Sequence, residues 1–260
     1  MSTTIAISGK GGSGKTTVAA MIVRTLVQGT GRSVLAVDAD PNACLGLALG
    51  VEPGTTISDI REATLDRTLQ GSPGMDRERA FEYAVQRAVV EAKGFDLLTM
   101  GLPEGPKCYC AVNHMVRRYL DGAARDYRYV VLDNEAGMEH LSRRTTDAVD
   151  HLVVVAEATA LGATTARRIL GLAQRLPIRV GRRSVLWNKV ADPATLAALE
   201  DGLPTIGRVP YDEAVLAASV RGASVFDLPA GNPALAAVAE MVARFVGAEA
   251  PPVSHPKERA

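Results

Sequence analysis

The chain has 260 residues, of which 47% are hydrophobic and 22% charged, a composition typical of a soluble globular protein with one large α/β domain. Its 29 basic and 29 acidic residues cancel, which argues against a surface dominated by positive charge for binding nucleic acid. The sequence has no apolar run of about 18 residues, no signal-peptide pattern and only three cysteines, so we expect a cytoplasmic protein without disulfides.

Short apolar segments alternate with helical patterns along the chain, which predicts a mainly parallel, twisted sheet flanked by helices on both faces. The expected strands are 4–8, 33–38, 95–100, 129–133, 151–156, 184–188 and 205–208. The expected helices are 15–27, 77–92, 111–122, 161–175, 193–201, 212–219 and 233–246, with a further short helix near 58–65. In such folds the functional loops gather at the carboxyl ends of the strands.

A glycine-rich segment joins the first expected strand to the first expected helix. It reads Gly9-Lys10-Gly11-Gly12-Ser13-Gly14-Lys15-Thr16 and continues with Thr17. This is the phosphate-loop pattern (P-loop) in its strand–loop–helix context, where backbone N–H groups and a helix N-terminus face one anion. We expect Lys15 to contact the β- and γ-phosphates of ATP, and the Thr16 hydroxyl to bind Mg²⁺. We therefore assign residues 1–247 to one P-loop ATPase domain, and 248–260, which hold three prolines, to a disordered tail.

Lys10 is a second lysine inside the loop. Because Lys15 already serves the phosphates of its own protomer, Lys10 has no clear task there. The loop resembles the deviant Walker A motif of the MinD, ParA and nitrogenase iron protein class, in which the early lysine contacts the nucleotide of the partner subunit. The resemblance implies an ATP-dependent homodimer in which Lys10 acts across the interface.

Two further expected strands end in carboxylates, which suit Mg²⁺ and water beside a triphosphate. Asp38 and Asp40 resemble the switch I segment of the same class, which implies that Asp40 activates the attacking water and Asp38 helps to hold the metal shell. Asp133 ends its strand as a Walker B acid does and would bind Mg²⁺ through water. The segment that follows resembles switch II, in which the Gly137 amide senses the γ-phosphate. Partition ATPases usually carry Asp-x-Pro here; Glu135 departs from that pattern and weakens the partition interpretation.

Two segments near later strands are expected on the base side of the nucleotide. Asn188 and Lys189 resemble the pair that recognises the purine in this class, with the Asn188 amide bonded to the base edge. Pro210 and Asp212 are placed like the later base-side loop. An asparagine after a strand is more often an ordinary turn residue.

Cys108 and Cys110 form a C-x-C pair that can present two thiolates to one soft metal ion. A closed thiolate site usually needs four ligands, and a twofold dimer would supply them. Four sulfurs suit Zn²⁺ in a tetrahedron or Ni²⁺ in a square plane, so the metal stays open. His114 is a further candidate near the pair or an ordinary solvated histidine, and Cys44, within an apolar run, is interpreted as a packing residue.

Together these motifs, over residues 4 to about 246, resemble the CooC family of nickel-insertion ATPases that mature carbon monoxide dehydrogenase. The resemblance implies a homodimer that binds nickel, or zinc in its place, through Cys108 and Cys110, and the apo-dehydrogenase as client. Whether ATP drives metal loading or release stays open.

Two other functions remain as alternatives. A partition or positioning ATPase would bind DNA or membrane, but the proline-containing tail cannot form a membrane-docking helix. An iron–sulfur cluster assembly ATPase tends to carry a C-x-x-C pair near its C-terminus, which this chain lacks. We therefore expect neither nucleic acid nor membrane as a partner.

Overall fold

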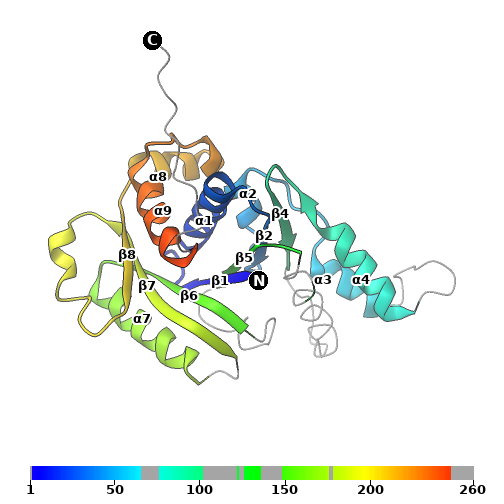
Figure 1. Cartoon of the computed structure of the whole chain (residues 1–260), viewed down its shortest axis with the longest axis horizontal. Coiled ribbons are helices and arrows are strands. Elements are labelled where there is room, and N and C mark those ends of the chain that lie inside the picture. Colours follow the sequence, from blue (N-terminus) through cyan, green and yellow to red (C-terminus); the bar gives the residue numbers. More distant parts are fainter. Residues whose placement is uncertain are drawn as a thin grey trace, which may run out of the picture.

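The computed structural model describes residues 2–65, 76–101, 122, 126–135, 148–175 and 178–246 (Figure 1). Within these residues one eight-stranded sheet has the order β3-β4-β2-β5-β1-β6-β7-β8, parallel throughout except for the edge pair β3–β4. The strands are β1 (Thr3–Gly9), β2 (Val34–Ala39), β3 (Val90–Glu91), β4 (Phe95–Thr99), β5 (Tyr129–Asn134), β6 (Ala148–Glu157), β7 (Arg179–Val190) and β8 (Thr205–Pro210). The helices are α1 (Lys15–Thr30), α2 (Leu45–Leu49), α3 (Ile57–Leu65), α4 (Arg77–Ala88), α7 (Ala160–Ala173), α8 (Glu213–Val220) and α9 (Pro233–Val246), with 3-10 turns η1 (Pro193–Leu196) and η2 (Val225–Asp227). The predicted fold class is confirmed.

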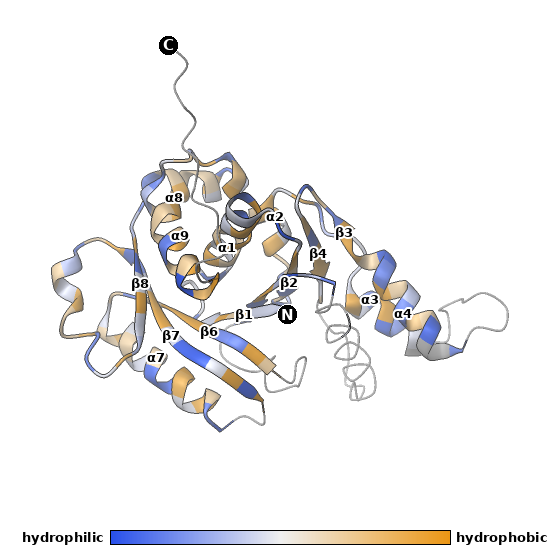
Figure 2. Cartoon of the chain, viewed as in Figure 1, coloured by the Kyte–Doolittle hydropathy of each residue, from blue (hydrophilic) through white to orange (hydrophobic). Residues whose placement is uncertain are grey.

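The central strands send their apolar side chains alternately into two cores, one on each face of the sheet. Ile5 and Ile7 of β1 pack with α1, α2, α8 and α9, whereas Ala6 between them packs with α3, α4 and α7. Because both faces are covered, the strands read as nearly continuous apolar runs. The amino-terminal half of β7 is the exception: it is hydrophilic and largely exposed, while its second half is buried (Figure 2).

Helix α1 runs against the centre of the sheet and carries the P-loop at its start. It begins after Gly14 and ends at Gly31, which adopts φ 62° and donates its N–H to the Val27 carbonyl. Halfway along, the Arg24 guanidinium is buried and donates hydrogen bonds to the carbonyls of Val225 and Leu228, the latter at 2.8 Å. One charged side chain thus attaches the η2 segment to α1.

Three predicted helices and one that was not predicted need comment. The helix predicted over 77–92 ends at Ala88, because the β-branched Val90 pairs with Leu97 as an edge strand. The helix predicted over 193–201 is only the short turn η1. Helix α2 was not predicted, and its five residues are too short for a clear periodic pattern. The helix predicted over 111–122 lies outside the described residues apart from Gly122.

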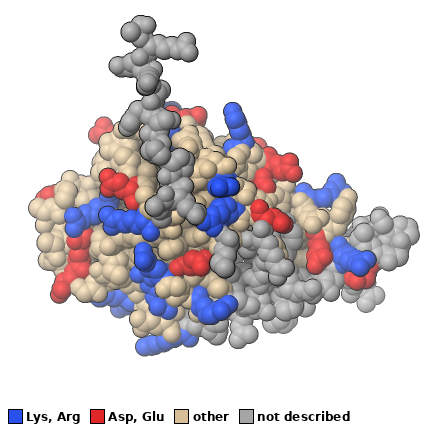
Figure 3. All heavy atoms as spheres, viewed as in Figure 1, with Lys and Arg blue, Asp and Glu red and all other residues tan. Residues whose placement is uncertain are grey.

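The surface shows basic and acidic side chains intermixed on the face drawn in Figure 3. Among the described helices, none combines the length and the apolar character that crossing a membrane requires.

Candidate nucleotide-binding site

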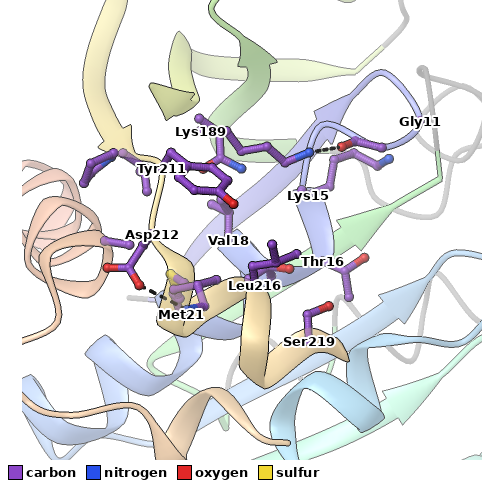
Figure 4. Close-up of a pocket in the computed structure, with 18 of the residues that line it drawn as sticks. Gly11, Lys15, Thr16, Val18, Met21, Lys189, Tyr211, Asp212, Leu216 and Ser219 are labelled. Atoms are coloured by element: carbon purple, nitrogen blue, oxygen red, sulfur yellow. Dashed lines mark hydrogen bonds between the residues drawn. The ribbon is translucent and has the colours of Figure 1, made fainter. Parts of the chain in front are cut away.

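A cavity of about 540 Å³ lies at the carboxyl ends of the strands, over the P-loop (Figure 4). Its walls come from the P-loop, from the first turns of α1, from the segment that joins β8 to α8, and from the ends of β2, β5 and β7. The topology therefore brings segments far apart in the sequence to one place, as expected for a parallel sheet.

At two positions of the P-loop, the backbone conformation leaves no room for a side chain. Gly14 has φ 90°, and a Cβ there would lie 2.4 Å from the Asn188 amide nitrogen. Gly9 has φ 155°, and its Cβ would lie 2.4 Å from the Val155 carbonyl oxygen. Glycine is required because the loop passes close to β6 and β7 while its peptide groups stay free to face an anion.

Lys15 and the start of α1 supply positive charge to the cavity floor. The Lys15 side chain is only 7% exposed, and its ammonium lies 3.5 Å from the Lys10 carbonyl oxygen. The N-terminus of α1 has no side-chain cap, because Gly14 occupies the capping position. Its first N–H groups and the Lys15 ammonium together suit a phosphate.

Asp38 and Asp133 lie opposite each other in the pairing of β2 with β5, and both are buried. Asp38 accepts hydrogen bonds from the N–H groups of Leu45 at 2.7 Å and Asp40 at 3.2 Å. Neither oxygen of Asp133 accepts a well-formed hydrogen bond from a described residue.

Burial is the main reason that the pKa of Asp38 rises to about 6 and that of Asp133 to about 7. The nearby Thr16 hydroxyl and the Lys15 charge lower the pKa of Asp133, but they only partly offset burial. A buried carboxylate that has no well-formed hydrogen bond is costly unless a cation lies beside it. The two acids and the Thr16 hydroxyl are hard oxygen ligands, so these residues fit Mg²⁺, which would lend positive charge to a bound triphosphate.

Asp40 lies at the cavity wall in a tight turn after β2. Its Oδ1 accepts hydrogen bonds from the backbone N–H of Asn42 at 2.9 Å and from the Asn42 side-chain amide at 2.7 Å. Its predicted role toward water is untested. Glu135 and Asn42 also line the cavity, although sequence reasoning gave neither a role there. Each lies two residues after a predicted site aspartate, and this closeness in sequence could have identified both as cavity residues.

The two side chains predicted to recognise the base, Asn188 and Lys189, donate hydrogen bonds to carbonyl groups of the P-loop in this structure. Asn188 donates its amide to the Ser13 carbonyl at 2.8 Å. Lys189, which extends toward the P-loop in Figure 4, donates to the Gly12 carbonyl at 2.7 Å. Both residues line the cavity, so they lie where predicted. Base recognition by them stays a prediction.

Pro210 and Asp212 also line the cavity as predicted. Both oxygens of Asp212 are engaged, however: Oδ1 caps α8 through the N–H groups of Ala214 and Val215, and Oδ2 accepts from the Asn232 amide at 2.9 Å. Asp212 thus fixes the shape of the wall.

The half-exposed Tyr211, which lies within the predicted base-side loop, and Leu216, which was not foreseen, form part of the same wall (Figure 4).

Lys10 is exposed at the outer edge of the P-loop, where no described residue forms an ion pair with its ammonium. It borders a second cavity of about 280 Å³ between the end of β6 and the start of α7.

Thr17 lines the main cavity next to Thr16. Cys108, Cys110, His114 and Gly137 lie outside the described residues.

The packing role predicted for Cys44 is wrong, because its side chain is exposed. It precedes α2, whose buried face begins at Leu45, and its Sγ lies 3.4 Å from the Asn42 carbonyl. Partial desolvation of the thiol by neighbouring atoms, followed by the negative charge of Asp38, raises its pKa. No cluster of three or more metal-binding side chains occurs in the part of the chain that the structure describes.

Residues 4–225 match the family described as the CobQ/CobB/MinD/ParA nucleotide binding domain. The chain is 40% identical over 253 residues to an uncharacterised ATP-binding protein of Methanocaldococcus jannaschii, covering 93% of this chain and 98% of that protein. It is 35% identical over 240 residues to the carbon monoxide dehydrogenase accessory protein CooC of Rhodospirillum rubrum, covering 86% and 89% of the two chains. Its fold is similar to a ParA family ATPase from Chlorobium tepidum, with a TM-score of 0.70, 23% identity, and 92% and 96% of the chains covered. Because the family match spans most of the chain and includes the loop whose backbone is open to phosphate, this chain belongs to the CobQ/CobB/MinD/ParA family and is an ATPase.

Proposed function

We propose that this ATPase is a metallochaperone that delivers nickel to carbon monoxide dehydrogenase. The observation that carries the proposal is the 35% identity to the CooC protein of Rhodospirillum rubrum, which extends over most of both chains. The Cys-x-Cys pair of this chain supplies the chemistry that a metal carrier needs. The relative at 40% identity is an uncharacterised ATP-binding protein and favours no particular client.

The cargo is held by Cys108 and Cys110 of two chains. Two thiolates from each subunit of a symmetric homodimer give one soft ion four sulfur ligands. Nickel is the expected metal, and zinc can occupy the same ligand set. The support for this site is the spacing of the two cysteines together with the CooC relationship.

The dimer forms when ATP is bound, with Lys10 of each chain reaching the nucleotide of its partner. The exposure of Lys10, and the absence of an ion-pair partner for it among the described residues, support this role. Within one chain, Lys15 neutralises the phosphates, Thr16 with Asp38 and Asp133 holds Mg²⁺, and Asp40 orients the attacking water. The Gly137 amide senses the γ-phosphate.

The test is the nickel content of the purified protein after size exclusion in the presence of ATP. We expect one nickel ion for two chains, and its loss when Cys108→Ser and Cys110→Ser are combined. Cys44→Ser is the matched control, because this exposed cysteine lies outside the pair and its replacement leaves the metal in place. Nickel that is absent from the wild type, or retained in the double variant, would overturn the shared thiolate site.

A second measurement addresses the client. Apo carbon monoxide dehydrogenase incubated with nickel, ATP and this protein should gain activity faster than with nickel and ATP alone. The Lys15→Ala variant, which cannot neutralise the phosphates, should give no acceleration. Equal activation by wild type and variant would reject ATP-driven insertion.

A further inference from the structure

Side chains from the end of β7 hold two consecutive peptide groups of the P-loop. Asn188 donates to the Ser13 carbonyl at 2.8 Å. The Lys189 side chain, labelled in Figure 4, donates to the Gly12 carbonyl at 2.7 Å. In a planar trans peptide, the C=O and the following N–H point in opposite directions. Fixing the two carbonyls outward therefore turns the N–H groups of Ser13 and Gly14 toward the inside of the loop. The Ser13 N–H donates across the loop to the Lys10 carbonyl at 3.2 Å, which leaves the Gly14 N–H of this pair to face a phosphate.

Glu157 at the end of β6 holds Lys189 in this position. Its Oε1 lies 2.8 Å from the Lys189 ammonium, and both side chains are about half exposed, at 42% and 45%. Glu157 is also the strand partner of Asn188 in the pairing of β6 with β7. The ammonium of Lys189 thus bridges Glu157 and the P-loop.

The backbone around Glu157 leaves it little freedom. Its carbonyl accepts a hydrogen bond from the Thr159 N–H at 2.7 Å, where the chain turns from β6 into α7. Gly162 in the first turn of α7 lies so close that a Cβ there would be 2.2 Å from the same carbonyl oxygen. The carboxylate is therefore presented from a tightly packed strand–helix junction, where strand, turn and helix all limit backbone motion.

Lys189 itself adopts an unusual backbone conformation. Its φ is 56°, in the left-handed region that residues with a side chain disfavour. Among the described residues, Ala43 is the other non-glycine residue with positive φ. Such a conformation persists where surrounding contacts over-determine it, and here the bonds to Gly12 and Glu157 are those contacts.

We infer that Glu157 is a positioning residue for nucleotide binding, because through Lys189 it orients the peptide groups of the P-loop toward phosphate. Glu157, Asn188 and Lys189 form a peptide clamp that fixes the loop before the nucleotide arrives. A loop already in its binding conformation loses less entropy on binding, which raises affinity. The inference rests on the ATPase activity of the family and is independent of nickel delivery.

Simple charge effects predict the opposite sign for this residue. Glu157 is a negative charge beside a site for a polyanion, so its removal should by electrostatics alone tighten phosphate binding. The peptide clamp predicts weaker binding, because Lys189 loses its counter-ion and the Gly12 carbonyl is held less firmly. One substitution therefore separates the two explanations.

The experiment measures binding of inorganic tripolyphosphate and of ATP, each with Mg²⁺, to the full chain by calorimetry. We expect Glu157→Gln to raise the dissociation constant about two- to fivefold for both ligands, the range of an exposed ion pair. Lys189→Met should raise it about tenfold for both, since the charged hydrogen bond to the loop is lost as well. The double variant should bind no worse than Lys189→Met, because Glu157 acts through Lys189.

Tripolyphosphate is informative because it has no base. If Lys189 acted on the purine alone, Lys189→Met would weaken ATP binding and leave tripolyphosphate unaffected. Glu200→Gln is the matched control, because Glu200 also forms an ion pair with a half-exposed cation, Arg208, at 2.6 Å and borders neither cavity. Tripolyphosphate binding that is unchanged or tighter in Glu157→Gln, or fully additive losses in the double variant, would overturn the inference.

Discussion

The buried pair Asp38 and Asp133 should make the stability of the metal-free protein depend strongly on pH. Burial raises the pKa of Asp133 to about 7 and that of Asp38 to about 6, whereas an aspartate in an unfolded chain has a pKa of about 3.9. The folded protein therefore binds more protons than the unfolded chain between these values. The resulting stabilisation is fully present below about pH 4 and is lost as the pH rises through 6 to 7.

Replacing Asp133 with Asn removes one titrating group at nearly constant shape. With a pKa of about 7 in the folded state, Asp133 alone lowers the free energy of unfolding by about 3 kcal/mol between pH 5 and pH 8. Asp133→Asn should lose about that much of the pH dependence. The pH dependence that Asp38 contributes should remain, because its pKa is raised mainly by its own burial.

Guanidinium unfolding at pH 5, 6, 7 and 8, in EDTA and without nucleotide, measures this difference. The comparison between wild type and variant at each pH cancels the titration of the other groups. Asp201→Asn, at an exposed carboxylate, should follow the wild-type curve in parallel. If the unfolding free energy of Asp133→Asn changes with pH as much as that of the wild type, folding does not raise the pKa of Asp133 and the reasoning fails.

Three further predictions concern the P-loop and its support. Gly14→Ala should weaken Mg-ATP binding at least tenfold in calorimetry, because the Cβ would meet the Asn188 amide at 2.4 Å. Arg24→Leu should lower the unfolding free energy by about 2 kcal/mol in chemical denaturation, since two carbonyls near η2 lose their donor. Lys15→Ala should abolish the release of phosphate from ATP. Lys10→Ala should retain ATP binding but no longer form ATP-induced dimers in size exclusion. Normal dimers of Lys10→Ala would show that Lys10 does not act on the nucleotide of the partner chain.

The sequence was sufficient for the fold and for the centre of the site because both rest on local patterns. Alternating apolar strands and helices follow from burial on both faces, and the P-loop is defined by glycines whose backbone conformation no other residue tolerates. Gly14 illustrates this: its φ of 90° and its contact with Asn188 leave no room for a side chain.

The sequence was insufficient where a residue's role depends on contacts between distant segments. Glu157 is an ordinary polar residue at a strand end until the sheet places it beside Lys189 and the P-loop. Cys44 lies in an apolar run, but the run starts a short helix whose buried face begins one residue later. Such pairings are set by tertiary packing and leave no periodic signal in the chain.

The same buried carboxylates should couple Mg²⁺ binding to proton release. A cation next to Asp133 favours the ionised form, so metal and proton compete for the site. With a pKa of about 7, Asp133 is about 90% protonated at pH 6 and about 10% at pH 8. The dissociation constant of Mg-ADP should therefore be about tenfold higher at pH 6 than at pH 8, beyond any change for ADP without metal.

Calorimetry at both values in buffers of different ionisation enthalpy counts the protons released. In Asp133→Asn the pH effect should be much smaller, because the remaining acid, Asp38, has a pKa of about 6 and is ionised over most of this range. An equal pH effect in wild type and variant would show that Asp133 does not face the metal. The lack of a well-formed hydrogen bond to the Asp133 oxygens would then be a result of how β5 pairs with β2. Burial of the Asp133 side chain would in that case destabilise the fold without serving the nucleotide site.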